Sequence, residues 1–532
     1  MTAITMQNLS LDGYNLTLSE VCAVARHNKK VELSAESRDA MQKSRSVVDK
    51  MLAENQVVYG VTTGFGKFKD VRINPKDILT MQENFLRSHA AGVGPTFDEA
   101  TVRAISLLRI NALAKGYSGI RTEVVDLLLD LLNRQVHPVV PEQGSVGASG
   151  DLAPLAHLSL TLIGEGKARY KGETLDSAEA LKKAGLKPVI LEAKEGLALT
   201  NGTQVMSAVG ALAVDEGTYL CKIADIVGAM TLEALLGSRT PMIPQVHKLR
   251  PHKGQIASAA NLIRLLANSE IMESHKHCSA VQDAYSLRCM PQVHGASRQA
   301  VYHAKEVLEI EFNAVTDNPL VIDGNMVSQG NFHGQPIALV MDYFAIAMSE
   351  LANISERRLE RLVNPTLSRG LPPFLTIAGG LNSGYMIAQY TAAALVSENK
   401  TLCHPASVDS IPTSANQEDH VSMGTIGSRK ARDILNNTKK VLAIELLCAL
   451  QALDLRLGVD TKSGEVAYSQ TDIESRGKRP GAGVEAAYKC ARQIIPFMEE
   501  DRPVWQDIEK AIALLDSRDM LAAVEKTVGD LD

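Results

Sequence analysis

The chain has 532 residues, of which 45% are apolar and 22% charged, the balance of a globular protein with a large core. Its formal net charge of −6 gives no electrostatic reason to expect nucleic acid or an anionic membrane as a partner. The first residues, MTAITMQNLSLDGYNL, lack a basic segment followed by an apolar stretch, so no secretory signal is expected. Seven cysteines are scattered without CxxC pairs, which is typical of reduced thiols in a cytoplasmic protein.

Aromatic residues make up only 4% of the chain, which favours helices over strands. We expect a loop-rich N-terminal region over residues 1–115 and a helical region over residues 116–532. The glycine cluster at residues 60–66 lacks a Gly-x-Gly-x-x-Gly pattern after a clear strand, which argues against a dinucleotide site. Residues 123–132 carry a wide apolar stripe and predict a helix. Residues 440–453 are apolar nearly all round and predict a helix in the middle of a bundle.

Two later segments need a separate interpretation. The longest uncharged stretch, Gly370 to Ser397, contains two consecutive prolines and several glycines and polar residues. This composition predicts a loop followed by a buried bundle helix rather than a membrane span. Residues 461–483 are polar and contain glycine, which predicts an exposed loop or a flexible insertion.

The most specific pattern of the chain lies at residues 144–157, which read GSVGASGDLAPLAH. If the amide nitrogen of Gly150 reaches the carbonyl carbon of Ala148, a five-membered ring closes. Loss of two waters, one of them from the Ser149 hydroxyl, then leaves a methylidene-imidazolone. Such a ring supplies a carbon electrophile that protein side chains lack, and glycine permits the dihedral angles needed. The simpler alternative is a small-residue loop with Asp151 as a helix N-cap and Pro154 in the first turn.

The complete string, rather than its central triplet, resembles the signature of the histidine and aromatic amino-acid ammonia-lyases and aminomutases. The resemblance runs from about Leu16 to Leu455. It implies a mainly α-helical, long-helix bundle of the fumarase/aspartase-like type. It also implies 4-methylidene-imidazol-5-one (MIO), formed autocatalytically from Ala148, Ser149 and Gly150, with no metal and no diffusible cofactor. The assembly implied is a homotetramer whose sites draw residues from more than one subunit.

Further segments match the family's site motifs. The octet from Tyr59 to Gly66, YGVTTGFG, matches the tyrosine loop, so the resemblance makes Tyr59 the candidate base. The segment QDAYSLR, residues 282–288, matches the segment in which an arginine binds the substrate carboxylate. Arg288 suits this role because its planar fork can bind a carboxylate through two hydrogen bonds. Gln282 and Tyr285 are expected to line the same site. Ala284 stands where the family often has proline, which is expected to loosen the turn without changing the three polar positions.

Three more motifs complete the set. Asn201 begins an Asn-Gly-Thr-Gln segment and is expected to hydrogen-bond the electrophile and the substrate, although Asn-Gly alone indicates only a turn. Phe332 matches the aromatic residue that packs beside the ring. Residues 316–320, TDNPL, are expected to support the site from behind.

Two positions bear on the substrate. Ser88 and His89 stand where phenylalanine-specific members resemble Phe-Leu, and a histidine there suits an imidazole or a phenol. Glu418 stands where relatives acting on histidine have glutamate and those acting on phenylalanine or tyrosine generally have glutamine. A carboxylate can accept an imidazole N–H, but it would be an unpaired buried charge against a phenyl ring. Without the resemblance, residues 418–420 would indicate a solvated charged turn.

A zinc site is the alternative for residues 275–278, HKHC. Histidines two residues apart point to different sides of a helix, and no second ligand pair follows at zinc-site spacing, so no metal is expected.

The function expected is elimination of ammonia from L-histidine to give trans-urocanate, the first step of histidine breakdown. The alternatives are a tyrosine ammonia-lyase or 2,3-aminomutase with the same electrophile, or a noncatalytic protein that keeps the fold. Whether the electrophile acts on the substrate amine or on its aromatic ring stays open at this point.

Overall fold

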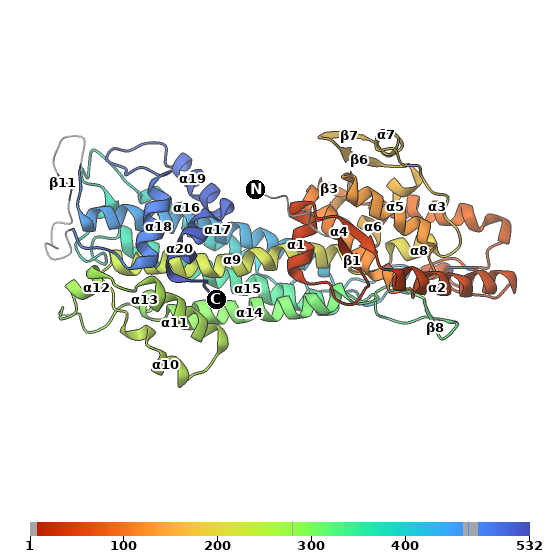
Figure 1. The fold of residues 1–532 in the computed structure, drawn as a ribbon, viewed down its shortest axis with the longest axis horizontal. Helices are drawn as coiled ribbons and strands as arrows, with labels where there is room; N and C mark the ends of the chain where they lie inside the picture. Colours follow the sequence, from red (N-terminus) through yellow and green to blue (C-terminus); the bar gives the residue numbers. More distant parts are fainter. Residues whose placement is uncertain (1–7, 279, 461–465, 468–476) are drawn as a thin grey trace. The chain divides into compact units, whose positions relative to one another are not determined.

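The computed structural model describes residues 8–278, 280–460, 466–467 and 477–532, and it is mainly α-helical, as predicted (Figure 1). The strands are short and pair in sheets of two or three within these residues. β1 and β2 pair in parallel, whereas β3–β5, β4–β6–β7, β8–β9 and β10–β11 are antiparallel.

Close packing divides the chain into two units. Unit 1 comprises residues 1–215, 304–342 and 405–432, and unit 2 comprises residues 216–303, 343–404 and 433–532. This division does not coincide with the expected boundary at residue 115. Residues 8–115 also hold four helices, so they contain more regular structure than a loop-rich region. Four long helices contribute residues to both units: α9 (Gln204–Ala234), α14 (Met290–Phe312), α15 (Gln335–Val363) and α17 (Gly424–Leu457).

Unit 1 carries short helices and strands around the first or last turns of the long helices. Its further helices are α1 (Leu18–His27), α2 (Ala35–Ala53), α3 (Ile78–His89), α4 (Glu99–Ala114), α5 (Thr122–Asn133), α6 (Leu152–Leu160), α7 (Ser177–Lys183) and α8 (Glu195–Thr200). Its strands are β1 (Leu9–Leu11), β2 (Val31–Leu33), β3 (Val93–Thr96), β4 (Val136–Pro138), β5 (Pro141–Gln143), β6 (Lys167–Tyr170), β7 (Glu173–Asp176), β8 (Leu320–Ile322) and β9 (Asn325–Val327).

Local sequence sets where several of these helices begin. The Thr17 side chain accepts a hydrogen bond from the Glu20 N–H, and the Glu20 carboxylate accepts one from the Thr17 N–H, which is a capping box at the start of α1. The Asp98 carboxylate accepts from the Thr101 N–H at 2.7 Å at the start of α4. α5 buries seven of its twelve residues, which confirms the helix predicted over 123–132.

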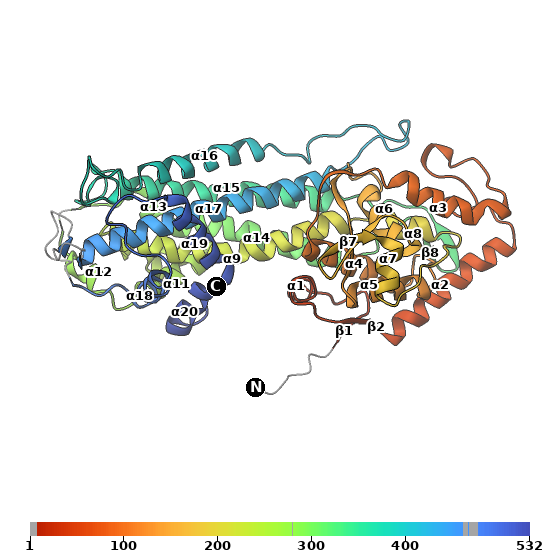
Figure 2. The ribbon, with the colours of Figure 1, turned by 90° about the horizontal axis from the view of Figure 1, so that it is seen from above.

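In unit 2, α9, α14, α15 and α17 lie side by side, as both views of the ribbon show (Figures 1 and 2). Glu445 of α17 accepts from Thr231, Ser355 and Arg358, which lie on α9 and α15. The other elements are α10 (Pro244–Lys248), α11 (Lys253–Leu265), α12 (Glu270–Ser274), α13 (Tyr285–Arg288), α16 (Met386–Leu402), α18 (Ala482–Arg492), α19 (Val504–Ser517), α20 (Asp519–Val528), β10 (Val459–Asp460) and β11 (Val466–Ala467).

The central position predicted for residues 440–453 is confirmed, because residues 441–453 of α17 are all buried. The prediction for Gly370–Ser397 is half wrong. A loop does precede α16, but α16 buries only Ala388, Ala392 and Asn399. The apolar residues of α16 are therefore not matched by burial within this chain.

The predicted loop at 461–483 lies largely outside the described residues. Residues 477–479 form an exposed loop, as predicted, but the end of the segment does not, because Gly483 is buried in the first turn of α18. A Cβ there would lie 2.9 Å from the Leu265 Cα atom. Of the described helices, α15 alone is long and apolar enough by composition to cross a membrane. In its most apolar window, 67% of the residues are buried inside the protein, as in a core helix.

Candidate active site

The Ala148-Ser149-Gly150 turn is held in a left-handed conformation just before α6. Ser149 has φ +52° and Gly150 has φ +75°. A Cβ at Gly150 would lie 2.2 Å from the Gly202 carbonyl oxygen, so only glycine fits. The Gly202 N–H donates to the Ser149 carbonyl at 3.2 Å, and the Gly202 carbonyl accepts from the Asp151 N–H at 2.7 Å. Left-handed geometry at Ser149 costs about 1–3 kcal/mol, which these tertiary contacts offset.

Asp151 connects this turn to the start of α9. Its carboxylate accepts from the N–H groups of Val205 and Met206, both at 2.9 Å, and from the hydroxyls of Ser145 and Thr425. Asp151 thus occupies the N-cap position of α6, but its side chain caps α9 instead. Complete burial raises the pKa of the Asp151 carboxyl to about 6, although these four hydrogen bonds lower it.

The small residues and left-handed angles of this turn fit the ring precursor proposed from the sequence. Asn201 lies next to Gly202, and its Nδ2 donates to the Asn318 carbonyl at 3.0 Å. Within the described residues, the Asn201 Oδ1 atom is buried and has no hydrogen-bond partner. An orphaned buried acceptor costs free energy unless a ligand satisfies it, so Asn201 is equipped to accept an N–H.

Tyr59 lies in the loop between α2 and α3 and is half-buried. Its hydroxyl oxygen accepts from the Gly66 N–H at 3.2 Å, seven residues along the same loop. Burial and, to a smaller degree, the charge of Glu418 raise the pKa of Tyr59, whereas the Gly66 N–H lowers it. Tyr59 and Glu418 are therefore electrostatic neighbours despite their separation in sequence.

His89 is the last residue of α3, and its ring lies against Phe85 with centroids 3.9 Å apart. Its Nδ1 atom is 2.8 Å from the Phe85 carbonyl oxygen. A carbonyl oxygen only accepts, so Nδ1 carries the proton and Nε2 of the neutral ring keeps its lone pair. Burial lowers the pKa of His89, although the Phe85 carbonyl and Glu418 raise it.

The charge of Glu418 thus raises the pKa of both Tyr59 and His89. Glu418 is half-buried, whereas the adjacent Asp419 and His420 are exposed, so the three residues do not form a uniformly solvated turn. Its Oε2 accepts from the Thr413 hydroxyl at 2.9 Å, which fixes the carboxylate across a short loop. A phenol, an imidazole and a carboxylate therefore influence one another's charge in the structure, and their roles in one site stay a prediction.

Phe332 lies in the turn before α15 and is half-buried, and its role beside the electrophile stays a prediction. The neighbouring His333 approaches His420, with Nε2 3.3 Å from the His420 carbonyl oxygen. The loop of Phe332 therefore adjoins the loop of Glu418.

The remaining three predicted residues belong to unit 2, so the structure does not group them with the residues above. Tyr285 and Arg288 begin and end the short helix α13, and the Arg288 guanidinium lies 4.7 Å from the Tyr285 ring centroid. Tyr285 is 72% exposed, and Gln282 is exposed too. In the described part of the chain, Nε of Arg288 is buried without a hydrogen-bond partner. The turn at Ala284 is intact, because its carbonyl accepts from the N–H groups of Leu287 and Arg288.

The histidine cluster at 275–278 does not resemble a metal site. The two ring nitrogens of His275 lie 2.7 and 2.9 Å from the carbonyl oxygens of Ile271 and Gly237. Across the described residues, no group of three His, Cys, Asp or Glu side chains is arranged to hold a metal ion.

Two residues that the sequence reasoning missed support the site. Arg109 is fully buried on α4 and donates to the carbonyl oxygens of Asn201 and Ala198 and to the Gln204 side chain. Burial lowers its pKa to about 10. Thr425 joins Asp151 from the start of α17. The sequence carried a signal for Arg109, because it is an arginine inside the apolar run of residues 102–114. It carried no signal for Thr425.

Comparison with known proteins agrees with this geometry. The sequence model described as "Aromatic amino acid lyase" matches residues 16–490, so the chain belongs to the aromatic amino acid lyase family. Within that family, the histidine ammonia-lyase of Gloeobacter violaceus is 54% identical, covering 98% of this chain and 99% of its own. The histidine ammonia-lyase structure from Trypanosoma cruzi is 43% identical, with a TM-score of 0.88, covering 98% and 96% of the two chains. The tyrosine aminomutase from Streptomyces globisporus is 38% identical, with a TM-score of 0.90, covering 99% and 100%.

Proposed function

We propose that this protein is an ammonia-lyase that converts L-histidine to trans-urocanate and ammonia. The observations that carry the proposal are that the Glu418 charge raises the pKa of both His89 and Tyr59, and that Lys69, in the loop after Tyr59, donates to Gln417 beside Glu418 at 2.9 Å. The full-length similarity to histidine ammonia-lyases supports it.

Two acceptors are available for the imidazole of the substrate. The Glu418 carboxylate accepts N–H groups, and the His89 Nε2 lone pair adds a second acceptor. A phenyl ring would leave both acceptors unsatisfied, at a cost of about 1–3 kcal/mol for each buried group. The pocket therefore selects a ring with N–H groups.

The electrophile proposed is MIO, formed from Ala148, Ser149 and Gly150, with no metal and no diffusible cofactor. When present, MIO supplies the carbon electrophile that activates the substrate for loss of ammonia. Tyr59 takes the β-proton, with the Gly66 N–H stabilising negative charge on its oxygen. Asn201 offers Oδ1 to an N–H of the substrate, and Phe332 packs beside the ring.

The carboxylate of L-histidine is assigned to Arg288, with Gln282 and Tyr285 beside it. Because these residues belong to unit 2, we propose that the site is shared between subunits of a homotetramer. The exposed Tyr285 ring and the half-buried Arg288 guanidinium, with its unsatisfied Nε, support binding of a carboxylate brought by another subunit's site.

Apolar surface on two helices supports assembly. On α15, Tyr343 and Ile346 are each 47% exposed, and on α16 Ile387 and Tyr390 are 59% and 60% exposed. Exposed apolar side chains of this size on adjacent turns are typical of subunit interfaces. The location proposed is the cytoplasm, which suits the buried thiols of Cys221 and Cys448. Burial raises the pKa of both thiols.

Changing Glu418 to Gln tests the choice of substrate. We expect kcat/KM for L-histidine to fall by about 10²-fold, because a charge-assisted hydrogen bond to the imidazole is lost. The pKa of Tyr59 should also fall, since the neighbouring negative charge is gone, and ultraviolet difference titration measures it. Asp419→Asn is the matched control, because Asp419 is exposed and makes the same charge change.

The same assays are run with L-tyrosine and L-phenylalanine, with acrylate and β-amino acid products identified. Unchanged histidine turnover in Glu418→Gln would contradict the proposal. Tyrosine turnover in the unchanged protein, with a β-amino acid as product, would favour the aminomutase alternative, which the similarity to tyrosine aminomutase keeps open.

Sharing of the site is tested by complementation. Tyr59→Phe and Arg288→Met chains, each with its own affinity tag, are co-expressed and purified through both tags. A mixed oligomer should recover a measurable fraction of wild-type turnover, because some sites combine an intact Tyr59 with an intact Arg288 from another chain. A mixed oligomer no more active than its two parents would show that both residues must come from one chain.

A further inference from the structure

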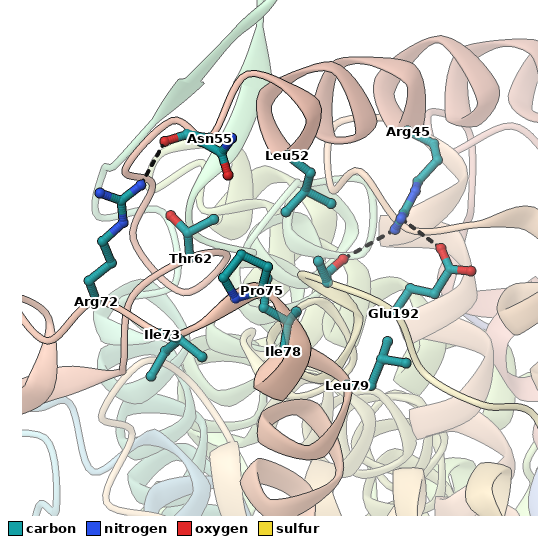
Figure 3. Close-up of a pocket in the computed structure, with 11 residues that line it drawn as sticks. Arg45, Leu52, Asn55, Thr62, Arg72, Ile73, Pro75, Ile78, Leu79 and Glu192 are labelled. Atoms are coloured by element: carbon teal, nitrogen blue, oxygen red, sulfur yellow. Dashed lines mark hydrogen bonds and ion pairs between the residues drawn. The ribbon is translucent and has the colours of Figure 1, made fainter.

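A cavity lined in part by Thr62 of the tyrosine loop lies within unit 1. Its volume is about 280 Å³, close to the lower end of the range for small-molecule sites. Figure 3 shows apolar side chains along its floor, with charged groups at two opposite ends. Its apolar lining consists of Leu52, Ile73, Pro75, Ile78, Leu79 and Ala193.

The two charged ends differ in how well they are neutralised. At one end Arg45 donates to Glu192 and Asp49, both at 2.8 Å, and also to the Ala193 carbonyl. Glu192 is further paired with Arg121. Arg45 is therefore fully engaged and needs no ligand.

The other end carries Arg72. The Arg72 guanidinium donates a hydrogen bond to the Asn55 carbonyl at 3.1 Å. Among the described residues, no carboxylate forms an ion pair with it. Arg72 is exposed, and the Asn55 carboxamide lies farther along the rim, beyond the Asn55 carbonyl (Figure 3). A planar cation and an amide donor next to an apolar hollow form a site for a carboxylate with an aliphatic body.

We propose that this cavity binds a small aliphatic monocarboxylate, with its carboxylate on Arg72 and Asn55 and its chain among Leu52, Ile73 and Ile78. Each methylene taken out of water contributes about 0.8 kcal/mol. A short fatty acid therefore gains binding free energy from both its carboxylate and its aliphatic chain, whereas a purely polar anion gains it from its charge alone.

The cavity is coupled to Tyr59 through Thr62, which lines it. The Thr62 hydroxyl accepts from the Val58 N–H at 2.9 Å and donates to the Gln56 carbonyl at 2.8 Å. The backbone carbonyl of Thr62 accepts from the Ile73 N–H. A bound aliphatic chain that packs on Thr62 and Ile73 holds the tyrosine loop against the segment that follows it. The binding site stands independently of the proposed function. Only its effect on turnover rests on the role of Tyr59.

Isothermal titration calorimetry with hexanoate tests the site on the full-length protein. We expect saturable binding, weakened at least about tenfold in Arg72→Gln and for hexanamide in place of hexanoate. Lys76→Gln is the matched control, since Lys76 is an exposed cation of the same loop that does not line the cavity. Hydrogen exchange of backbone amides 56–74 should slow when hexanoate is bound to the wild type.

Three results would overturn the proposal. The first is no saturable heat with the wild-type protein. The second is equal affinity in wild type, Arg72→Gln and Lys76→Gln. The third is loss of hexanoate binding in Arg288→Met but not in Arg72→Gln, which would place the ligand at the substrate carboxylate site. All three readouts are independent of histidine turnover, so failure here and failure of the proposed function are distinguishable.

Discussion

Changing Ser149 to alanine is expected to abolish release of ammonia from L-histidine while leaving the protein folded. Without the Ser149 hydroxyl the second water cannot be lost and no electrophile forms. We expect kcat to fall by at least about 10³-fold, as when a covalent catalyst is removed from another enzyme. Alanine meets the same strain at φ +52°, so the free energy of unfolding should change by less than about 1 kcal/mol.

Intact-mass measurement separates loss of the electrophile from other causes. The wild-type chain should weigh less than its sequence by two water molecules, whereas Ser149→Ala should lack at most one, the water of ring closure. Ser46→Ala, an exposed hydroxyl on α2, serves as the control and should retain both the mass deficit and the activity. A wild-type chain of full sequence mass would leave the noncatalytic alternative standing.

Changing Tyr59 to phenylalanine should lower kcat by about 10²–10⁴-fold, the usual contribution of a positioned general base. The aromatic ring stays in place, and only the oxygen that accepts from the Gly66 N–H is removed. Steady-state kinetics with L-histidine should show most of the loss in kcat rather than KM, because the substrate contacts assigned to His89, Glu418 and Arg288 remain.

The mass of Tyr59→Phe is informative as well. Its electrophile should form normally, so the chain should still lack two waters, which distinguishes it from Ser149→Ala. Tyr170→Phe removes a hydroxyl from β6 and is expected to keep wild-type kinetics. Retention of full activity in Tyr59→Phe would assign proton removal to another group.

The helical class and the position of α17 could be predicted because they depend on local composition and periodicity. The exposure of α16 could not, because an apolar helix looks the same in sequence whether its own chain or another subunit covers it. At the candidate site, motifs indicated Tyr59, His89 and Glu418, whose roles stay predictions.

The sequence could not show which predicted residues share a unit. Arg288 and Tyr59 belong to different packing units, and no spacing in the sequence indicates this. It also could not show that the Asp151 side chain caps α9 rather than its own helix. Capping patterns are local, whereas this contact joins residues 54 and 55 positions apart.

The contacts that hold the Ala148–Gly150 turn come from far along the chain. Gly202 packs on Gly150, the Met423 N–H donates to the Val146 carbonyl, and Asp151 reaches Thr425. An unfolded chain lacks all of these contacts, and a half-synthesised chain lacks Met423 and Thr425, so neither can hold the turn that ring closure needs. If this turn forms the proposed electrophile, its ring closure must follow folding, so the order of the two events is set by the tertiary contacts of the turn.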